Sequence, residues 1–430
     1  MLYSRKILIS VIVALSVVFL QSGRVFSSEK NITVPEKKIN GNIFSYSSLN
    51  RKVILIEKKT DRLFLVNIRD DTPVIVSEYP VVTGQNNGDK LREGDQRTPE
   101  GIYFIQKYIP PEKLNTLLFG DGAFPINYPN LVDRIHGKTG HGIWIHGRGK
   151  LTNGRRTNGC ISLSNKDLAT LKAFLVRGFP VVITEELDFL TPEEYKKEKE
   201  RYLRYLRDFI SAWQNNDFPS FKKFFSRSFR SSWNEDYDVY LERKKRLMLQ
   251  YPEKDITLKD IILYKENSRE LMYEYKQLYC SSNYIDFGLK RLYLEGDSNG
   301  QYSIIAEEYR KLPVVPEIKG YIIDFINKWL SSWKKQDINS YISFYSADFR
   351  HGSMDLNEWR EYKESVFKKS NIKDIQIENI TIQLVSGGRI KARFVQDYKS
   401  DILEDRGIKT LIIEGCPEDY RIIQEYWKPL

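Results

Sequence analysis

Cysteine and histidine are scarce in this chain of 430 residues, which contains three cysteines and four histidines. No CxxC pair and no cluster of cysteine and histidine at metal-ligand spacing occurs, so the sequence predicts no structural zinc or other metal site. The cysteines, Cys160, Cys280 and Cys416, lie far apart. In an oxidising compartment their odd number implies at least one free thiol, while Cys280 and Cys416 either pair or are buried as small apolar side chains.

A long apolar run is also missing. The run at residues 7–20 is shorter than the ~20 residues that a transmembrane helix needs. It follows Arg5-Lys6 and precedes small and polar residues, which is the order of a secretory signal. We therefore expect residues 1–28 to be a signal peptide and the protein to be exported to the periplasm or cell envelope. Because no Ala-x-Ala box is present, an uncleaved membrane anchor is the alternative.

Basic runs with interleaved aromatic residues are absent too, which argues against nucleic acid as a partner. The formal net charge is +10, but lysine and arginine are dispersed along the chain, as on a solvated surface. Hydrophobic residues make up 41% and aromatic residues 13% of the sequence, which excludes disorder as the main state. The chain is therefore predicted to be globular, with aromatic cores.

Short apolar runs follow one another between residues 51 and 186. Runs such as 53–56 and 63–66 are separated by polar turn residues, which is the pattern of a β-meander. The polar stretch 83–101 carries several glycines but lacks the GxxxxGK[ST] order of a phosphate-binding loop. We expect a mostly β domain over residues 51–186, preceded by a polar linker over residues 29–50.

A histidine and a cysteine are the chemically notable residues of this domain. His146 follows the apolar run 143–145, and Cys160 lies in a glycine-bearing turn. A thiol is a weak nucleophile until a base removes its proton or a positive neighbour lowers its pKa, so the two residues are candidates for nucleophilic catalysis. The alternative is a buried, inert cysteine and a structural histidine. His141 competes as the base, but at five positions before His146 it faces the other side of a strand.

Four motifs in this region occur in a fixed order, at residues 94–101, 128–130, 145–147 and 157–160. Together they resemble the L,D-transpeptidase catalytic domain, also called the YkuD domain, over about a third of the chain. The resemblance implies a mostly β fold with a Cys/His acyl-transfer centre that acts on peptidoglycan stem peptides without a cofactor. In that chemistry a thiolate attacks the carbonyl of the third stem residue, and an amine or water resolves the thioester.

The matched positions give each residue an expected role. Cys160 would be the nucleophile and His146 the general base, with backbone N–H groups at Gly159 and Asn158 stabilising the oxyanion. Glycine at position 159 would let the backbone approach the reacting carbonyl. The expected substrate-binding residues are Arg155, Arg156, His141 and Tyr128.

Two positions depart from the common family pattern. Ser162 stands where an arginine is common, and Asn158 stands where a histidine is frequent. An arginine would have suited a substrate carboxylate, and Arg155 or Arg156 could supply that charge instead. Family branches with similar departures include hydrolases that trim stem peptides without crosslinking them.

The C-terminal half contains an internal repeat. Trp213, Asp217 and Phe221 recur about 120 positions later as Trp333, Asp337 and Tyr341. Each copy begins with helical spacing and continues with alternating strands, which predicts two tandem α+β domains. The pattern resembles NTF2-like domains, which accompany some L,D-carboxypeptidases of curved bacteria. We expect the copies at 200–312 and 318–430, with a role in binding, positioning or dimerisation.

The predicted protein is therefore a multidomain enzyme with a mostly β, YkuD-like catalytic domain followed by two NTF2-like domains. It would remodel the cell wall by L,D-transpeptidation or by L,D-carboxypeptidase trimming of tetrapeptide stems to tripeptides. The alternative is a catalytically vestigial scaffold that binds peptidoglycan through its repeats, and Ser162 is its only support.

Overall fold

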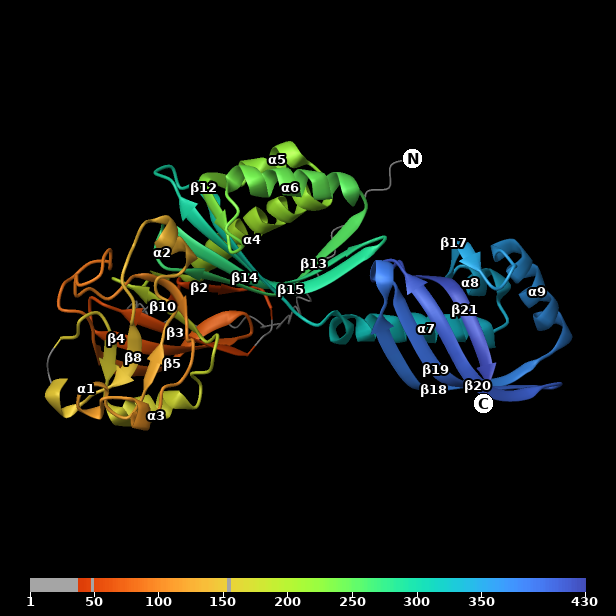
Figure 1. Cartoon of the computed structure of the whole chain (residues 1–430), viewed down its shortest axis with the longest axis horizontal. Coiled ribbons are helices and arrows are strands. Elements are labelled where there is room, and N and C mark those ends of the chain that lie inside the picture. The colour runs from red at the N-terminus through yellow and green to blue at the C-terminus, as the bar shows by residue number, and fades with distance from the viewer. Residues whose placement is uncertain (1–37, 48–49, 153–155) are drawn as a thin grey trace, which may run out of the picture.

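The computed structural model describes residues 38–47, 50–152 and 156–430. The predicted signal peptide, the first part of the predicted linker and Arg155 lie outside the described residues. Three folded units follow one another along the chain. Figure 1 shows the first two units together and the third at the other end of the molecule.

The first unit is mostly β. Its strands and helices are β3 (Arg51–Glu57), β4 (Arg62–Arg69), β5 (Thr72–Val82), β6 (Gly101–Phe104), α1 (Thr116–Phe119), β7 (Ala123–Pro125), α2 (Leu131–Ile135), β8 (Trp144–Gly147), β9 (Ile161–Leu163), α3 (Asn165–Lys172) and β10 (Pro180–Thr184). The eight strands form one sheet in the order β6-β10-β3-β4-β5-β9-β8-β7. Residues of β3 alternate between two buried clusters, with Ile54 and Ile56 in one and Val53 and Leu55 in the other. Burial on both faces explains why this strand reads as a continuous apolar run.

The segment 38–47 is not a linker, contrary to the prediction from its polar composition. It contains β1 (Ile39–Asn40), which pairs with β11 (Phe189–Leu190), and β2 (Ile43–Ser45). β2 joins the sheet of the second unit, and the fully buried Phe44 stacks on Tyr195 with ring centroids 4.8 Å apart. So short a strand carries no periodic signal, and its order comes from tertiary pairing.

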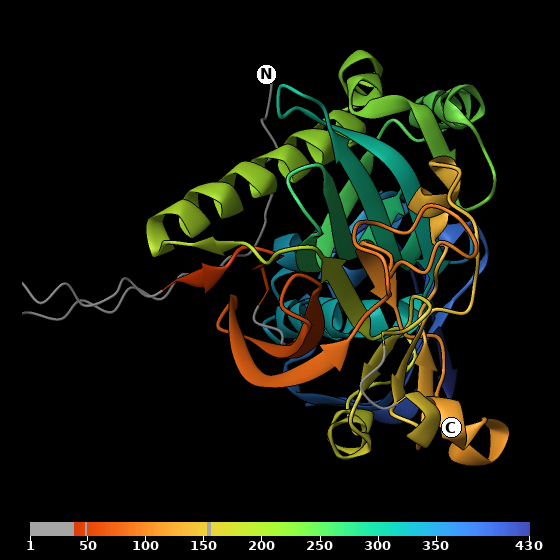
Figure 2. The ribbon, with the colours of Figure 1, turned by 90° about the vertical axis from the view of Figure 1, so that its left-hand side faces the viewer.

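The second unit, here called repeat 1, packs helices against an antiparallel sheet. Its elements are α4 (Pro192–Gln214), α5 (Phe218–Lys223), β12 (Phe225–Ser231), α6 (Tyr237–Gln250), β13 (Lys254–Lys265), β14 (Glu270–Ser281), β15 (Tyr284–Gly296) and β16 (Tyr302–Lys311), with the sheet order β12-β16-β15-β14-β13-β2. Thr191 caps α4, because its side chain accepts the N–H of Glu194 and the Glu194 carboxylate accepts the N–H of Thr191. Figure 2 shows β1 beside the N-terminal end of this long helix.

The third unit, here called repeat 2, has the same order of elements. These are α7 (Val314–Lys334), α8 (Ile338–Ile342), β17 (Tyr345–Arg350), α9 (Leu356–Lys369), β18 (Ile372–Leu384), β19 (Ile390–Ser400), β20 (Glu404–Glu414) and β21 (Arg421–Pro429), in a sheet of order β17-β21-β20-β19-β18. The predicted internal repeat is confirmed, since each unit places a short parallel strand beside its last strand. Within the described residues, no helix is long and apolar enough to cross a membrane.

Each repeat also buries a carboxylate against a lysine, which the sequence analysis did not predict. Glu307 lies 3.1 Å from the Lys290 ammonium in repeat 1, and Glu425 pairs with Lys409 in repeat 2. All four residues are at most 5% exposed. Although burial opposes it, the lysines beside each carboxylate lower the pKa of Glu307 and of Glu425 to about 2. Both carboxyl groups are therefore ionised in the folded protein at neutral pH.

The first unit and repeat 1 share an apolar interface. Val53 of β3 belongs to the same buried cluster as Ile262 and Tyr264 of β13. At its edge Arg51 forms an ion pair of 2.5 Å with the buried Glu274 of β14. The two units are therefore packed directly against each other.

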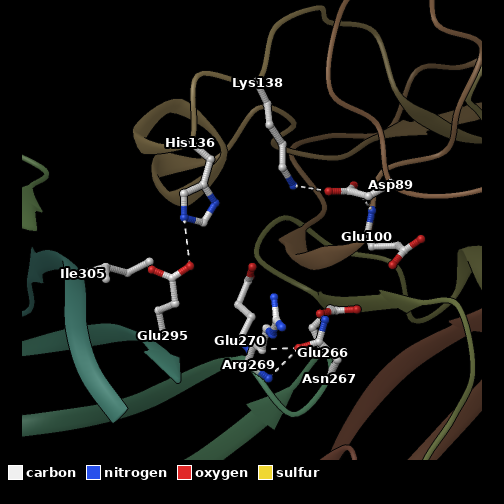
Figure 3. Close-up of a pocket in the computed structure, with 10 residues that line it drawn as sticks. All are labelled: Asp89, Glu100, His136, Lys138, Glu266, Asn267, Arg269, Glu270, Glu295 and Ile305. Atoms are coloured by element: carbon white, nitrogen blue, oxygen red, sulfur yellow. Dashed lines mark hydrogen bonds and ion pairs between the residues drawn. The ribbon is translucent and has the colours of Figure 1, made fainter. Parts of the chain in front are cut away.

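A cavity of about 210 Å³ lies at the same interface, and charged side chains line most of it (Figure 3). His136 of the first unit reaches Glu295 of repeat 1 at 3.4 Å. Glu270 points into the cavity, and its Oε1 is buried without a hydrogen-bond partner among the described residues. Burial raises the pKa of Glu270 to about 8 and that of Glu266 to about 9. Both carboxyls are therefore protonated at neutral pH.

The two repeats are joined by a disulfide. Cys280 in β14 is bonded to Cys416, which follows β20, with Cα atoms 5.6 Å apart. Lys259 of repeat 1 and Glu317 of α7 add an ion pair of 2.5 Å. Of the alternatives left by the sequence, Cys280 and Cys416 therefore pair, and Cys160 is the free cysteine.

Candidate active site

The sheet brings the strand that carries His146 beside the strand that follows Cys160. β8 and β9 pair in parallel, with His146 opposite Ser162. Because side chains alternate across a strand, Cys160, two positions before Ser162, faces the same side as His146. The strand pairing continues this register, since Ile145 lies opposite Ile161 and Gly147 opposite Leu163. The strand register therefore places the thiol beside the strand that carries the histidine.

The backbone fixes the tautomer of His146. Its Nδ1 lies 2.6 Å from the Gly147 carbonyl oxygen. Since a carbonyl can only accept, Nδ1 carries the proton and Nε2 is left as the basic nitrogen. The ring is 3% exposed, and its burial lowers the pKa of His146 below the ordinary value, although the Gly147 carbonyl acts in the opposite direction. His146 is therefore a neutral base at neutral pH.

The thiol of Cys160 is protonated in the resting protein. Its Sγ lies 3.4 Å from the Gly142 carbonyl oxygen. Burial raises the pKa of the Cys160 thiol to about 11, against the opposing effects of the Trp144 N–H and the Lys90 ammonium. A neutral thiol beside a neutral imidazole needs proton transfer to the histidine during attack, as in general-base catalysis.

The turn before Cys160 is held by two threonines. The Thr157 hydroxyl accepts the Gly159 N–H at 3.1 Å and donates to the Cys160 carbonyl at 2.6 Å. The Thr98 hydroxyl donates to the Gly159 carbonyl at 3.0 Å. Gly159 has φ +120°, and a Cβ there would lie 2.7 Å from the Arg97 carbonyl oxygen, so only glycine fits.

These contacts change the expected role of Gly159. Its N–H points to the Thr157 hydroxyl, so it is not the free oxyanion donor that the sequence analysis expected. Asn158 lies on the exposed rim of the turn, where its side-chain oxygen accepts from Gln85 Nε2 at 2.9 Å. The contribution of Gly159 is conformational, because it permits the tight approach of the turn to the loop around Arg97.

The expected substrate-binding residues do not converge on the thiol. Arg156 donates to Asp61 Oδ1 at 2.8 Å and to the Thr83 hydroxyl at 3.0 Å, so its guanidinium is already paired. His141 is 81% exposed and lies 3.6 Å from Glu93, which agrees with its exclusion as the base.

Tyr128, which the sequence analysis expected to bind substrate, is buried in this structure and bonded within its own domain. Its side chain is 6% exposed, and its hydroxyl donates to the Thr139 carbonyl at 3.0 Å. The aromatic ring packs against Tyr103 with centroids 6.1 Å apart. Tyr128 therefore holds the loop that leads to Gly142, because packing uses both its apolar ring and its polar tip.

Lys90 and Asp95 are a feature of the site that sequence reasoning missed. Lys90 is 3% exposed, and its ammonium donates to Asp95 Oδ1 at 2.7 Å and to the Arg92 carbonyl at 3.1 Å. Burial opposes ionisation, but the Lys90 ammonium and the N–H groups of Arg92 and Leu91 hold the pKa of Asp95 well below its usual range. The position of Asp95 in the first ordered motif was the available signal.

No group of three or more potential metal ligands occurs within the described part of the chain. The chemistry that this site offers rests on a thiol, an imidazole and backbone groups.

Comparison with known proteins matches the three folded units to two family models. The family model of the L,D-transpeptidase catalytic domain, YkuD, matches residues 51–183. The first unit is an L,D-transpeptidase domain. The model of the Cds6 C-terminal NTF2-like domain matches twice, at residues 201–308 and 321–426, so both repeats are NTF2-like domains. The predicted fold class is thereby confirmed.

Two solved structures resemble a large part of this chain. Bd1075 from Bdellovibrio bacteriovorus has a TM-score of 0.58 and 27% identity, and the match covers 64% of this chain and 99% of that one. The helical cell shape determining protein Pgp2 from Campylobacter jejuni has a TM-score of 0.51 and 28% identity, with 62% and 94% covered. More than a third of this chain has no counterpart in either structure.

A curated relative is similar over a shorter stretch. This chain is 30% identical over 118 residues to the Escherichia coli K12 protein named "Putative L,D-transpeptidase YafK". The match covers 26% of this chain and 44% of YafK, so it spans less than half of that relative's length.

Proposed function

We propose that the protein is an exported cysteine enzyme that acts on peptidoglycan stem peptides through a thioester at Cys160. The parallel register of β8 and β9 is the observation that carries this proposal, because it sets Cys160 beside the strand of a neutral, oriented His146. Peptidoglycan peptides are the substrate class that the L,D-transpeptidase domain implies.

The proposed reaction uses the tautomer that Gly147 imposes. His146 Nε2 accepts the thiol proton while Cys160 Sγ bonds to the carbonyl carbon of the third stem residue. The imidazolium then gives that proton to the leaving amine of the terminal D-amino acid, and a thioester remains. Water or an amine attacks the thioester next, with His146 again accepting a proton. The N–H groups of Asn158 and Cys160 are the proposed oxyanion donors, since the Gly159 N–H is bound to Thr157.

We favour trimming of tetrapeptides to tripeptides over crosslinking. Ser162 replaces the arginine common in the family, and its hydroxyl lies 3.5 Å from the Gly147 carbonyl, where it cannot bind a second stem peptide as an arginine could. The similarity to Pgp2, named as a cell shape determining protein, supports a role in shaping the cell wall.

The proposed location is the periplasm or cell envelope. The disulfide between Cys280 and Cys416 fits an oxidising compartment, because such bonds rarely persist in the cytosol. The N-terminal signal predicted from the sequence agrees with this location.

Incubation of the purified protein with a disaccharide tetrapeptide, with and without an amine acceptor, tests the proposal. Release of tripeptide in both cases indicates hydrolysis, whereas a crosslinked dimer formed only with the acceptor indicates transfer. His141→Ala is the matched control, because it removes an exposed histidine of the same loop region. An unchanged substrate would favour the vestigial scaffold instead.

A further inference from the structure

The catalytic domain holds one buried cation close to the proposed nucleophile. Lys90 lies in the loop between β5 and β6, and two of its three ammonium donors bind Asp95 and the Arg92 carbonyl. Asp95 in turn accepts the N–H groups of Leu91 and Arg92, at 2.8 and 3.0 Å. The ion pair is therefore built into the loop and is not a chance surface contact.

The loop that carries Gly140 and Gly142 connects Lys90 to the thiol. A Cβ at Gly140 would lie 3.2 Å from Lys90 Cε, so the lysine stem runs directly against this glycine. Two residues further, the Gly142 carbonyl contacts Cys160 Sγ at 3.4 Å. The positive charge acts on the thiol across this short segment, since Lys90 lowers the pKa of Cys160 while burial raises it.

Several other charged groups lie around this corner, and the Arg97 guanidinium donates to the Asp89 carbonyl at 3.3 Å. Lys138 binds Asp89 at 2.6 Å and Asp133 at 2.9 Å. His141 lies 3.6 Å from Glu93 on the exposed side of the loop. His146, on the neighbouring strand β8, is neutral at neutral pH, because burial lowers its pKa.

We propose that the Lys90–Asp95 pair sets the reactivity of Cys160, with the Lys90 ammonium stabilising the thiolate and the Asp95 carboxylate limiting that effect. Lys90 is then a positioning residue, since it acts on the thiol without touching the substrate. This arrangement supplies a positive charge near Cys160 in a chain that lacks the arginine after it. The inference rests on the proposed role of Cys160 as the nucleophile, but it can be tested without peptidoglycan.

Alkylation of Cys160 by iodoacetamide, followed by intact mass as a function of pH, measures thiolate formation directly. Cys280 and Cys416 are bonded to each other, so Cys160 is the cysteine open to the reagent. Lys90→Met should slow alkylation at pH 7 by about 3- to 10-fold, as expected for loss of one nearby charge. Asp95→Asn should accelerate it by a similar factor, because the ammonium is then uncompensated.

A purely structural role of this loop would not change the alkylation rate in opposite directions in Lys90→Met and Asp95→Asn. Lys138→Met is the matched control, since it removes another ion-paired lysine of this region that is not among the groups shifting the pKa of Cys160, and its alkylation rate should equal that of the native protein. Melting temperatures establish that each variant folds. If one variant does not fold, the direction in which the alkylation rate of the other changes, relative to Lys138→Met, decides the test. Equal rates, or shifts of the same sign in Lys90→Met and Asp95→Asn, overturn the inference. If peptidoglycan is not cleaved but the opposite shifts appear, only the proposed function fails.

Discussion

Removal of the disulfide should destabilise the two NTF2-like domains. The Cys280–Cys416 bond closes a loop with a sequence separation of 136 residues. In the chain-entropy view, a crosslink over such a loop raises the free energy of the unfolded state by about 5 kcal/mol at 25 °C. Replacing both cysteines by alanine should therefore lower the free energy of unfolding by up to about 5 kcal/mol, or roughly 10–20 °C in melting temperature for a unit of this size.

Differential scanning calorimetry of the Cys160→Ala protein, with and without dithiothreitol, measures this effect without thiol exchange. Reduction should lower the transition of the NTF2-like domains by the same amount as the double alanine substitution. The double variant should not respond to dithiothreitol, and the transition of the L,D-transpeptidase domain should move little. The reasoning is refuted if reduction leaves every transition of the disulfide-containing protein in place.

Three further results are expected. The pKa of Glu270 is raised to about 8, so the contribution of its protonated form to stability is complete below the ordinary glutamate pKa and is lost as pH rises through about 8. Thermal melts of Glu270→Gln should therefore show a smaller loss of stability between pH 5 and 9 than melts of the native protein. Glu307→Gln should cost about 3–5 kcal/mol in urea unfolding, because it leaves Lys290 buried without its partner, and replacing both residues by apolar ones should cost less. Burial lowers the pKa of His146, so kcat/KM should hold at pH ~6.5 and fall only at lower pH, when the imidazole becomes protonated; an acid limb above pH 7 contradicts this assignment.

The residues that sequence reasoning identified best are those whose signal is local. The ordered motifs placed Cys160 and His146 in one domain, and the alternation rule rejected His141 as the base, because each argument needs only neighbouring positions. The repeated aromatic spacing gave two α+β domains for the same reason. Strand order and the parallel register of β8 and β9 could not be predicted, since they depend on contacts far apart in the chain.

The remaining features arise from tertiary contacts. Phe44 lies in a strand because β2 pairs with β13. The Tyr128 hydroxyl, which the sequence predicted to face substrate, donates to the Thr139 carbonyl. The sequence predicted that charged residues lie on a solvated surface, yet Lys90 and Glu307 are buried. A buried ion pair leaves no periodic pattern, because its stability comes from a partner elsewhere in the fold.

Cys160 is expected to form the acyl-enzyme, with His146 as its base. Rapid quenching of the protein with a disaccharide tetrapeptide, followed by peptide mapping by mass, tests it most directly. We expect a stem-peptide adduct on the peptide that contains Cys160, with one terminal amino acid released per adduct. Adduct formation should be slower in His146→Ala and absent in Cys160→Ala. Tripeptide formed by Cys160→Ala at the native rate, or an adduct on any other residue, would contradict it.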